Sequence, residues 1–335
     1  MPVPTDPFHI HIPGSLSDHA RSVLTAALDP SIVLGLNEPG ADAGQYRILV
    51  SGRPKREQLE ANPDLQAVIV PFAGVPPETR TLVEEDFPHL TVHNLHHNAD
   101  ATAEMAFALL LAAAKFIVHD DRALRRHDWT PRYESSRSLG LAGKTALVLG
   151  YGAIGQRVAR MCRGMDMQVL ATKRTATQVE SPAEGIHIHP PQDLPALLPQ
   201  ADAVIVCLPQ TPETTGLLGG AELALLPKGA VLANIGRGPI VDQAALYAAL
   251  ASGHLRAAGL DVWYNYPETE ESRTHTPPAD FPFHELDNVV MTPHRGGALE
   301  EIETETLRMQ ALAVLLNTAA QGSPMPNRVD LGLGY

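Results

Sequence analysis

Residues 144–155, KTALVLGYGAIG, constrain the fold of this chain more than any other stretch. The apolar, β-branched run from Thr145 to Leu149 has the length of a buried strand, and it ends at a G-x-G-x-x-G. The next residues, AIGQRVARMCRGM, carry apolar side chains at helical spacing. Strand, glycine turn and helix in this order are typical of a dinucleotide-binding unit, whose helix N-terminus faces a pyrophosphate.

Each glycine of this turn has a predicted role. Gly150 makes the tight turn, Gly152 lets backbone N–H groups approach the pyrophosphate, and Gly155 lets the helix lie close to the strand. The alternative is an ordinary glycine turn that binds nothing, and the order of elements favours the first interpretation.

The second strand of such a unit normally ends in an acid that holds the ribose 2′-hydroxyl, and that acid is absent here. MQVLATKRTA ends instead in Thr172, Lys173, Arg174 and Thr175. Two cations at this point attract a 2′-phosphate, so the sequence favours NADP(H) over NAD(H). The alternative is that both are solvated loop charges.

Composition limits the possible partners and the compartment. The chain has 335 residues, enough for two domains, and its formal charge of −13 argues against nucleic acid or an anionic membrane as a partner. The longest apolar stretch, Met105 to Val118, is too short to span a bilayer and contains Lys115, so it predicts a buried helix. MPVPTDPFHI lacks the pattern of an export signal, and Cys162 and Cys207 suit a reducing compartment, so we expect a cytoplasmic protein.

The order of apolar runs predicts two α/β regions. Residues 1–97 contain short strands between polar segments, which indicates a doubly wound parallel sheet, and residues 144–293 repeat this pattern. Residues 98–117 predict a long buried helix, residues 299–320 predict another helix, and the acidic stretch 264–285 predicts a loop near a site. The strands expected in the first region are FHIHI, SIVLGL, YRILV, LQAVIVPF and LTVHNL.

One predicted strand of the first region runs directly into Ala73 and Gly74, in PFAGVPP. Open α/β sheets bind ligands just beyond the carboxyl ends of their strands, so backbone N–H groups here could hold an anion. From this stretch alone a plain strand-end turn is favoured.

Seven motifs occur in order along the chain: TAEMAFALLLA, GYGAIG, LPQTPETTGLL, LPKGAVLANIGRGPIVDQAAL, AAGLDVW, NVVMTPHRGG and NRVDLGLGY. In these motifs the chain resembles the D-isomer-specific 2-hydroxyacid dehydrogenases, a family that includes glyoxylate/hydroxypyruvate reductases, phosphoglycerate dehydrogenase and formate dehydrogenase. The resemblance implies two doubly wound parallel-sheet domains of the α/β class. A Rossmann NAD(P)-binding domain, residues 99–298, is inserted into a flavodoxin-like catalytic domain made of residues 1–98 and 299–335.

The resemblance also implies a catalytic set. Arg237 corresponds to the clamp on the substrate carboxylate, a task that suits a planar guanidinium, and His294 corresponds to the general acid–base. Ala73 and Gly74 correspond to the carboxylate-binding backbone, with Asn98 beside them, and Asp261 to the acid that accepts from the nicotinamide carboxamide. The full set of predicted cofactor contacts is Thr102, Gly150, Gly152, Ala153, Ile154, Gly155, Lys173, Arg174, Pro209, Thr214, Ile235, Gly236, Asp261 and Gly297.

One position departs from the family pattern. Relatives usually carry a glutamate five residues after the Asp of LDV, and here Tyr266 stands there, ahead of Pro267. A carboxylate beside His294 would favour the charged imidazole, whereas a neutral phenol orients the ring and supplies little of that bias. Glu268 or Glu270 of the acidic loop are alternative partners, and formate dehydrogenases also carry a neutral residue at this position.

Two histidine groups, one at His93, His96 and His97 and one at His187 and His189, lack cysteine or carboxylate neighbours at a metal-ligand spacing, so no metal is expected. The sequence therefore predicts a homodimeric oxidoreductase that transfers hydride between NADP(H), or NAD(H), and a small 2-oxo or 2-hydroxy acid. The alternatives are formate-dehydrogenase-like oxidation of an anion and a non-catalytic NAD(H)-sensing protein of the same fold.

Overall fold

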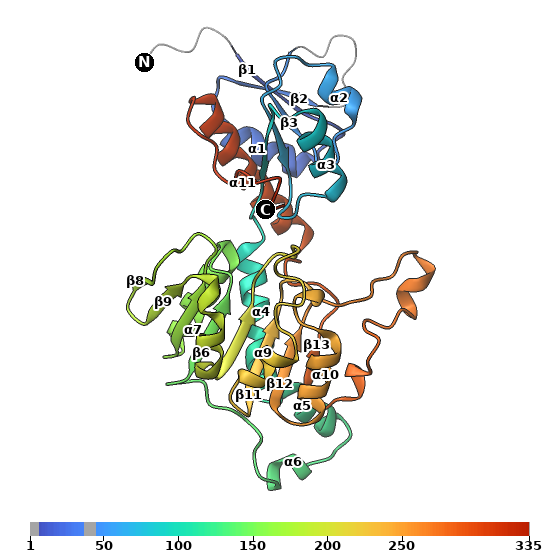
Figure 1. The fold of residues 1–335 in the computed structure, drawn as a ribbon. Coiled ribbons are helices and arrows are strands. Elements are labelled where there is room, and N and C mark those ends of the chain that lie inside the picture. The colour runs from blue at the N-terminus through green and yellow to red at the C-terminus, as the bar shows by residue number, and fades with distance from the viewer. Residues whose placement is uncertain (1–6, 37–44, 335) are drawn as a thin grey trace. The chain divides into compact units, whose positions relative to one another are not determined.

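The computed structural model describes residues 7–36 and 45–334, and it divides into two compact units. Unit 1 comprises residues up to Asn98 and those from Ala298 onward, and unit 2 comprises Ala99–Gly297. Figure 1 shows the ribbon coloured along the chain, with the C-terminal helix of unit 1 in red beside its N-terminal blue elements. The first six residues, on which the export-signal prediction partly depends, lie outside the described residues.

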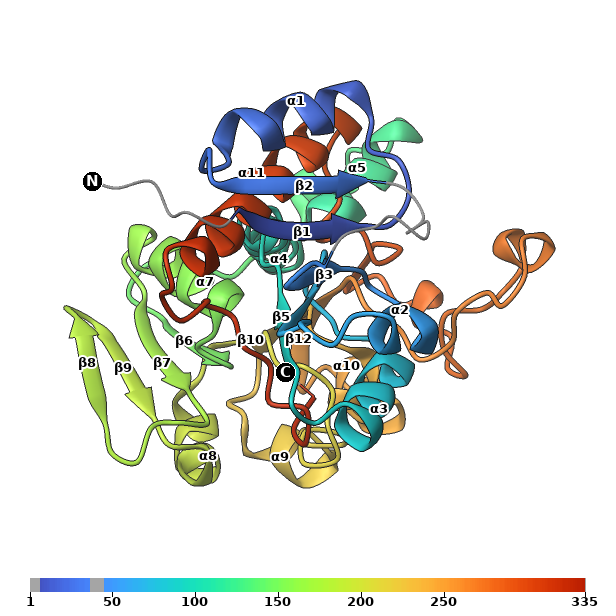
Figure 2. The ribbon, with the colours of Figure 1, turned by 90° about the horizontal axis from the view of Figure 1, so that it is seen from above.

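Unit 1 is built around a five-stranded parallel sheet in the order β2-β1-β3-β4-β5, which is the flavodoxin-like order. Helices α1 and α11 pack on one face, and α2 and α3 lie on the other (Figure 2). The predicted parallel sheet is confirmed. The elements are β1 (Phe8–Ile12), α1 (Asp18–Ala27), β2 (Ile32–Leu36), β3 (Ile48–Val50), α2 (Arg56–Glu60), β4 (Ala67–Val70), α3 (Pro77–Asp86), β5 (Thr91–Asn94) and α11 (Glu301–Ala320).

Unit 2 is built around an eight-stranded sheet in the order β13-β12-β11-β10-β6-β7-β9-β8. All neighbours are parallel except the β8–β9 pair, and β6 to β7 and β10 to β12 follow the Rossmann arrangement. The strands are β6 (Thr145–Leu149), β7 (Gln168–Thr172), β8 (Glu180–Ala183), β9 (Ile186–His189), β10 (Ala203–Val206), β11 (Ala230–Asn234), β12 (Leu255–Leu260) and β13 (Val289–Met291).

The central strands of this sheet are covered on both faces. Leu147 and Leu149 of β6 are fully buried, and burial of each such side chain stabilises the fold by about 1.5–3 kcal/mol. One face packs against α4 and α7, and the other against α8, α9 and α10. The helices of unit 2 are α4 (Ala99–Ala114), α5 (Ile117–Arg125), α6 (Thr130–Tyr133), α7 (Ala153–Gly164), α8 (Leu194–Leu197), α9 (Gly220–Leu225) and α10 (Gln243–Ala251).

Two details of unit 2 differ from the sequence prediction. The helix expected over 98–117 ends at Ala114, because Phe116 adopts a left-handed backbone (φ 55°) with its ring buried beneath the guanidinium of Arg137, and α5 begins after it. The β8–β9 hairpin was not expected, because β8 is the polar run ESPA, which lacks the apolar pattern of a strand. It forms a strand only through its antiparallel pairing with β9.

Within the described residues no single helix is long and apolar enough to cross a membrane. Helices α4 and α5 together pass that test by length and composition, but they are bent by 65° at the break between them.

Candidate active site

The glycine turn lies where the strand order of unit 2 reverses, between β6 and β10. Gly150 has φ 96°, and a Cβ there would lie 3.1 Å from the carbonyl oxygen of Cys207. A Cβ on Gly155 would lie 1.9 Å from the carbonyl oxygen of Gly150, so only glycine lets α7 lie this close to the strand end. The space beside Gly152 is open, which leaves room for a ligand at the N-terminus of α7.

The end of β7 is tied to this turn. The Thr172 side chain accepts from the N–H of Gly150 at 3.3 Å, and its carbonyl accepts from Tyr151 at 2.8 Å. Lys173 and Arg174 follow directly, so both cations lie at the strand end beside the glycine turn. Hydrogen bonds, chiefly from Thr211, and to a smaller extent the charge of Arg174 keep the pKa of Glu213 below its usual value.

The turn after β11 presents Arg237. Asn234 is buried, and its side chain accepts from the N–H of Gly236 at 3.0 Å and donates to the carbonyl of Arg237 at 3.0 Å. A Cβ on Gly236 would lie 2.5 Å from the carbonyl oxygen of Leu208, so the turn packs tightly against the end of β10. Asn234 was not among the predicted site residues, although an amide at the end of a buried strand and just before G-x-G could have indicated this role.

The Arg237 side chain is exposed, with one guanidinium nitrogen donating to the carbonyl of Gly236 at 2.7 Å. Its charge acts on two neighbours, because it contributes to the lowered pKa of His294 and opposes the rise that burial causes in the pKa of Tyr266. The structure therefore brings these three predicted catalytic side chains together within unit 2.

The imidazole of His294 is paired with a phenol. The Tyr266 hydroxyl lies 2.9 Å from Nδ1 of His294, and the phenol oxygen accepts from the N–H of Trp263 at 3.1 Å. Burial lowers the pKa of His294 and Arg237 lowers it further, while Asp261 opposes them. Burial raises the pKa of Tyr266, so the phenol is neutral over the ordinary pH range.

One of the two alternative partners in the acidic loop, Glu270, forms an ion pair elsewhere. Glu270 is paired with Arg273 at 2.7 Å, and within the described part of the chain no ion pair joins His294 to a carboxylate. A cavity of about 700 Å³ lies between this loop and the His294 turn. Its lining is Trp263, Asn265, Tyr266, Pro267, Arg273, Thr276, Pro278, Met291, Thr292, Pro293 and His294.

The turn that carries His294 is held by Asp261. This carboxylate is 1% exposed, and it accepts from Thr292 Oγ1 at 2.6 Å, from the N–H of Arg295 at 2.8 Å and from the N–H of Gly296 at 2.7 Å. His294 itself has φ 54°, a conformation that costs a non-glycine residue about 1–3 kcal/mol. Hydrogen bonds to a charged group contribute about 1.5–3 kcal/mol each, so the three together outweigh that cost.

The remaining predicted contacts of unit 2 lie in three places. Ala153 and Ile154 form the first turn of α7, and Thr214 is fixed by a 2.7 Å hydrogen bond to the carbonyl of Pro209. Ile235 is buried beside Gly236, Thr102 is buried in α4, and Gly297 follows the His294 turn.

The predicted substrate residues Ala73, Gly74 and Asn98 belong to unit 1. The carbonyl of Ala73 accepts from the Asn94 side chain at 2.5 Å, which fixes the loop after β4 to the end of β5. Gly74 is exposed and Asn98 is half-buried.

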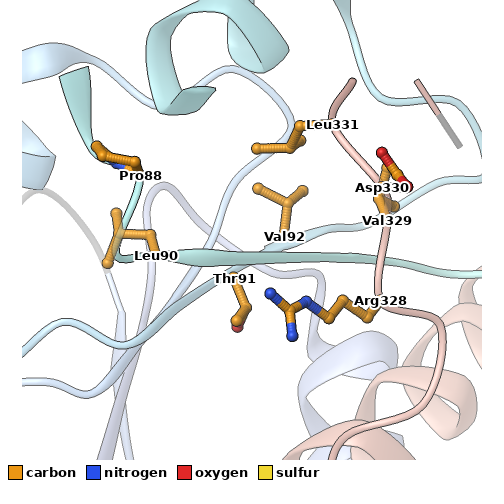
Figure 3. Close-up of a pocket in the computed structure, with 8 residues that line it drawn as sticks. All are labelled: Pro88, Leu90, Thr91, Val92, Arg328, Val329, Asp330 and Leu331. Atoms are coloured by element: carbon orange, nitrogen blue, oxygen red, sulfur yellow. The ribbon is translucent and has the colours of Figure 1, made fainter. Parts of the chain in front are cut away.

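A second cavity, of about 420 Å³, lies in unit 1 and contains none of the predicted site residues. Figure 3 shows it between β5 and residues 328–331, the segment that pairs with β5 through the 2.8 Å hydrogen bond from Val329 to Val92. Its lining is Pro88, Leu90, Thr91, Val92, Arg328, Val329, Asp330 and Leu331.

Several of the histidines have structural partners. His93 bonds the carbonyl of Pro326 at 2.8 Å, His187 bonds Ser181 at 2.9 Å and His189 bonds Asp193 at 3.3 Å. Burial, with Arg308 and His96, lowers the pKa of His97 to about 4. Among residues 7–36 and 45–334 no three His, Cys, Asp or Glu side chains are grouped to hold a metal ion.

A comparison with protein families matches residues 107–296 to the D-isomer specific 2-hydroxyacid dehydrogenase NAD binding domain. The match covers more than half of the chain and includes the glycine turn, Arg237, Tyr266 and His294. The chain belongs to this dehydrogenase family.

Curated members of this dehydrogenase family are similar to the chain in sequence. D-3-phosphoglycerate dehydrogenase of Archaeoglobus fulgidus is 36% identical over 236 residues, which is 70% of this chain and 41% of that protein. Glyoxylate reductase of Korarchaeum cryptofilum is 35% identical over 233 residues, which is 69% of this chain and 66% of that protein. The chain thus matches less than two thirds of the length of either relative.

The same dehydrogenase fold is found among solved structures. A D-isomer specific 2-hydroxyacid dehydrogenase from Xanthobacter autotrophicus Py2, in complex with NADPH and MES, is 28% identical with a TM-score of 0.74. That similarity covers 97% of this chain and 100% of the other. The predicted fold class is therefore confirmed.

Proposed function

We propose that this chain reduces a small 2-oxo acid with NADPH to the corresponding 2-hydroxy acid. The observation that carries the proposal is the grouping of Arg237, Tyr266 and His294 within unit 2, with the Tyr266 hydroxyl 2.9 Å from the His294 ring. A carboxylate clamp and a proton donor are the two groups that such a reduction requires beyond the cofactor.

In this proposal NADPH supplies the hydride, and the chain supplies the remaining groups. The open space at Gly152 and the N-terminus of α7 receive the pyrophosphate, and Lys173 and Arg174 attract the 2′-phosphate. The NADPH complex of the Xanthobacter relative supports this choice.

Arg237 binds the substrate carboxylate through two parallel N–H donors, which fixes the orientation of the carbon that is reduced. His294 donates a proton to the carbonyl oxygen of the substrate. Tyr266 holds the imidazole through Nδ1, which leaves Nε2 to face the reacting oxygen. The additional roles of Ala73, Gly74 and Asn98 in binding the carboxylate stay a prediction.

The test is the steady-state oxidation of NADPH and of NADH against glyoxylate, hydroxypyruvate, pyruvate and bulkier 2-oxo acids. Turnover with at least one acid, with a higher kcat/KM for NADPH than for NADH, is expected. Tight cofactor binding without any turnover would instead identify a sensing protein.

A second candidate is oxidation of formate or a similar anion, in which no proton leaves an oxygen. The neutral Tyr266 at the position of the family glutamate favours it, because such a reaction has no need of a charged imidazole. NADP⁺ reduction in the presence of formate separates it from the first proposal.

The homodimer and the cytoplasmic location stay proposals of the same kind. They are tested by sedimentation of the purified protein and by fractionation of the cells that make it.

A further inference from the structure

We propose that Asp261 is a positioning residue, whose carboxylate holds the turn of residues 292–296 so that His294 is presented in its working orientation. The inference rests on the proposed function, in which His294 is the proton donor. It differs from the role that the family resemblance implies for this aspartate, a contact to the nicotinamide carboxamide.

The placement of Asp261 follows from the sheet. Strands β12 and β13 are parallel neighbours, and Asp261 and Thr292 come directly after them. The carboxylate therefore lies at the same edge as the turn, 33 residues away along the chain from His294. The N–H of Asp261 continues the sheet by donating to the carbonyl of Asn234 at 3.0 Å, so the backbone that carries the carboxylate is itself fixed.

The contacts bracket His294 on both sides. Thr292 donates its hydroxyl to Oδ1 from two residues before it, and Arg295 and Gly296 donate their backbone N–H groups to Oδ1 and Oδ2 from the residues after it. Glycine is needed at 296, because a Cβ there would lie 2.8 Å from Asp261 Oδ2. The residue between these anchors takes a left-handed backbone, which side chains rarely adopt without such support.

The Asp261 carboxylate can accept one more hydrogen bond than the turn supplies. A carboxylate has about four lone-pair sites, and the turn occupies three of them. A contact to the cofactor can therefore coexist with the anchoring role, and the experiment has to separate the two.

The decisive variant is Asp261→Asn, which keeps the size of the side chain and replaces one acceptor oxygen by an amide donor. The exchange of the amide hydrogens in residues 292–296 should become at least about tenfold faster, as expected when a local opening becomes easier. Hydrogen exchange of this peptide, measured by mass spectrometry without any ligand, tests this.

The His294 ring provides a second measurement that needs no turnover. The charged and titratable groups that act on it are Arg237, Asp261 and Tyr266. Loss of the negative charge of Asp261, which raises the pKa of His294, should lower that pKa further. NMR titration of ¹³C-labelled histidine measures it, with the His294 signal identified by its loss in His294→Ala.

The kinetic pattern separates positioning from cofactor binding. If Asp261 acts mainly by positioning, Asp261→Asn should lower kcat while the Kd for NADPH stays within about twofold of that of the unmodified protein, because the loss then falls on the proton-transfer step rather than on cofactor binding. A matched control is Asp242→Asn, which alters another aspartate that accepts a backbone N–H, at the start of α10. That control should leave the exchange of residues 292–296, the His294 titration and kcat unchanged.

Thr292 provides milder variants in case Asp261→Asn does not fold. Thr292→Val removes one of the three donors at nearly constant volume, and Thr292→Ser restores the hydroxyl. The valine variant should show faster exchange and lower kcat than the serine variant.

The proposal is overturned if the exchange of residues 292–296 and the His294 titration are the same in Asp261→Asn as in the unmodified protein. It is also overturned if the Kd for NADPH is the only quantity that changes. Failure of the unmodified protein to reduce any 2-oxo acid would refute the proposed function and leave both the exchange and the titration readable.

Discussion

Two turns in unit 2, both at the carboxyl ends of parallel strands, reach unusual backbone conformations by different means. The turn after β6 does so with glycine, since Gly150 has φ 96° and Gly155 is in contact with the strand end. The turn after β13 does so with a histidine at φ 54°, held by the carboxylate of Asp261. One turn is specified by the residues within it, and the other by a residue from a neighbouring strand end.

The difference matches the tasks that we propose for the two turns. A turn that receives a pyrophosphate needs bare backbone N–H groups and open space, which glycine provides. A turn that presents a proton donor needs a side chain at the tip, so glycine cannot be used there and external hydrogen bonds must stabilise the conformation.

The largest effect is expected for His294→Ala, which removes the functional group and keeps the anchored turn. Loss of a positioned general acid should lower kcat/KM for 2-oxo acid reduction by about 10²–10⁴-fold. Steady-state kinetics measure it, and the Kd for NADPH should stay near that of the unmodified protein. Activity within threefold of the unmodified protein would show that His294 is not the donor.

Arg237→Lys is expected to have the second-largest effect on activity. Lysine keeps the charge and loses the planar two-point grip, so kcat/KM should fall by about tenfold to a hundredfold. Cofactor affinity should be nearly unchanged. An equal loss of NADPH binding would mean that Arg237 serves the cofactor or the fold.

The glycine turn is tested by a pair of variants. Gly155→Ala places a methyl group against the Gly150 carbonyl and should destabilise the protein by about 1–3 kcal/mol, seen as a Tm lower by several degrees. Gly152→Ala meets open space, so its Tm should be unchanged while the Kd for NADPH rises. Equal melting temperatures in the two variants would contradict the packing role of Gly155.

Cofactor preference should respond to Lys173→Asp. Replacing attraction by repulsion at the 2′-phosphate should lower the ratio of kcat/KM for NADPH to that for NADH by at least about tenfold. Kinetics with both cofactors measure the ratio. The prediction fails if the unmodified protein already uses NADH equally well.

The smallest effect concerns pH. Burial and Arg237 lower the pKa of His294, so the protonated imidazole is lost as pH rises through a comparatively low value, and reduction should decline there. Tyr266→Glu places a carboxylate beside the ring and should move this decline to higher pH by about one unit. Profiles of kcat/KM against pH for both proteins decide it. An unmoved decline would show that the residue at 266 does not set the charge of His294.

Local signals allowed much of the fold to be predicted. The buried runs of β6, β10 and β11 are short and β-branched, and the motif after β6 depends on its own three glycines, so both were readable without the structure. The end of the long helix at Ala114 could not be predicted in this way. The left-handed backbone of Phe116 follows from the burial of its ring and not from the helix propensity of the surrounding residues.

The sequence by itself determined the α/β class, the glycine turn and the residue types of the site. Tertiary structure decided how the site is held: Asn234 fixes the turn before Arg237, Trp263 directs the Tyr266 hydroxyl, and Asp261 supports His294. Each of these depends on hydrogen bonds, and those of Asp261 join strand ends that are distant in the sequence. A periodic pattern records which face of an element is buried, and it carries no information about which donors meet a given carboxylate.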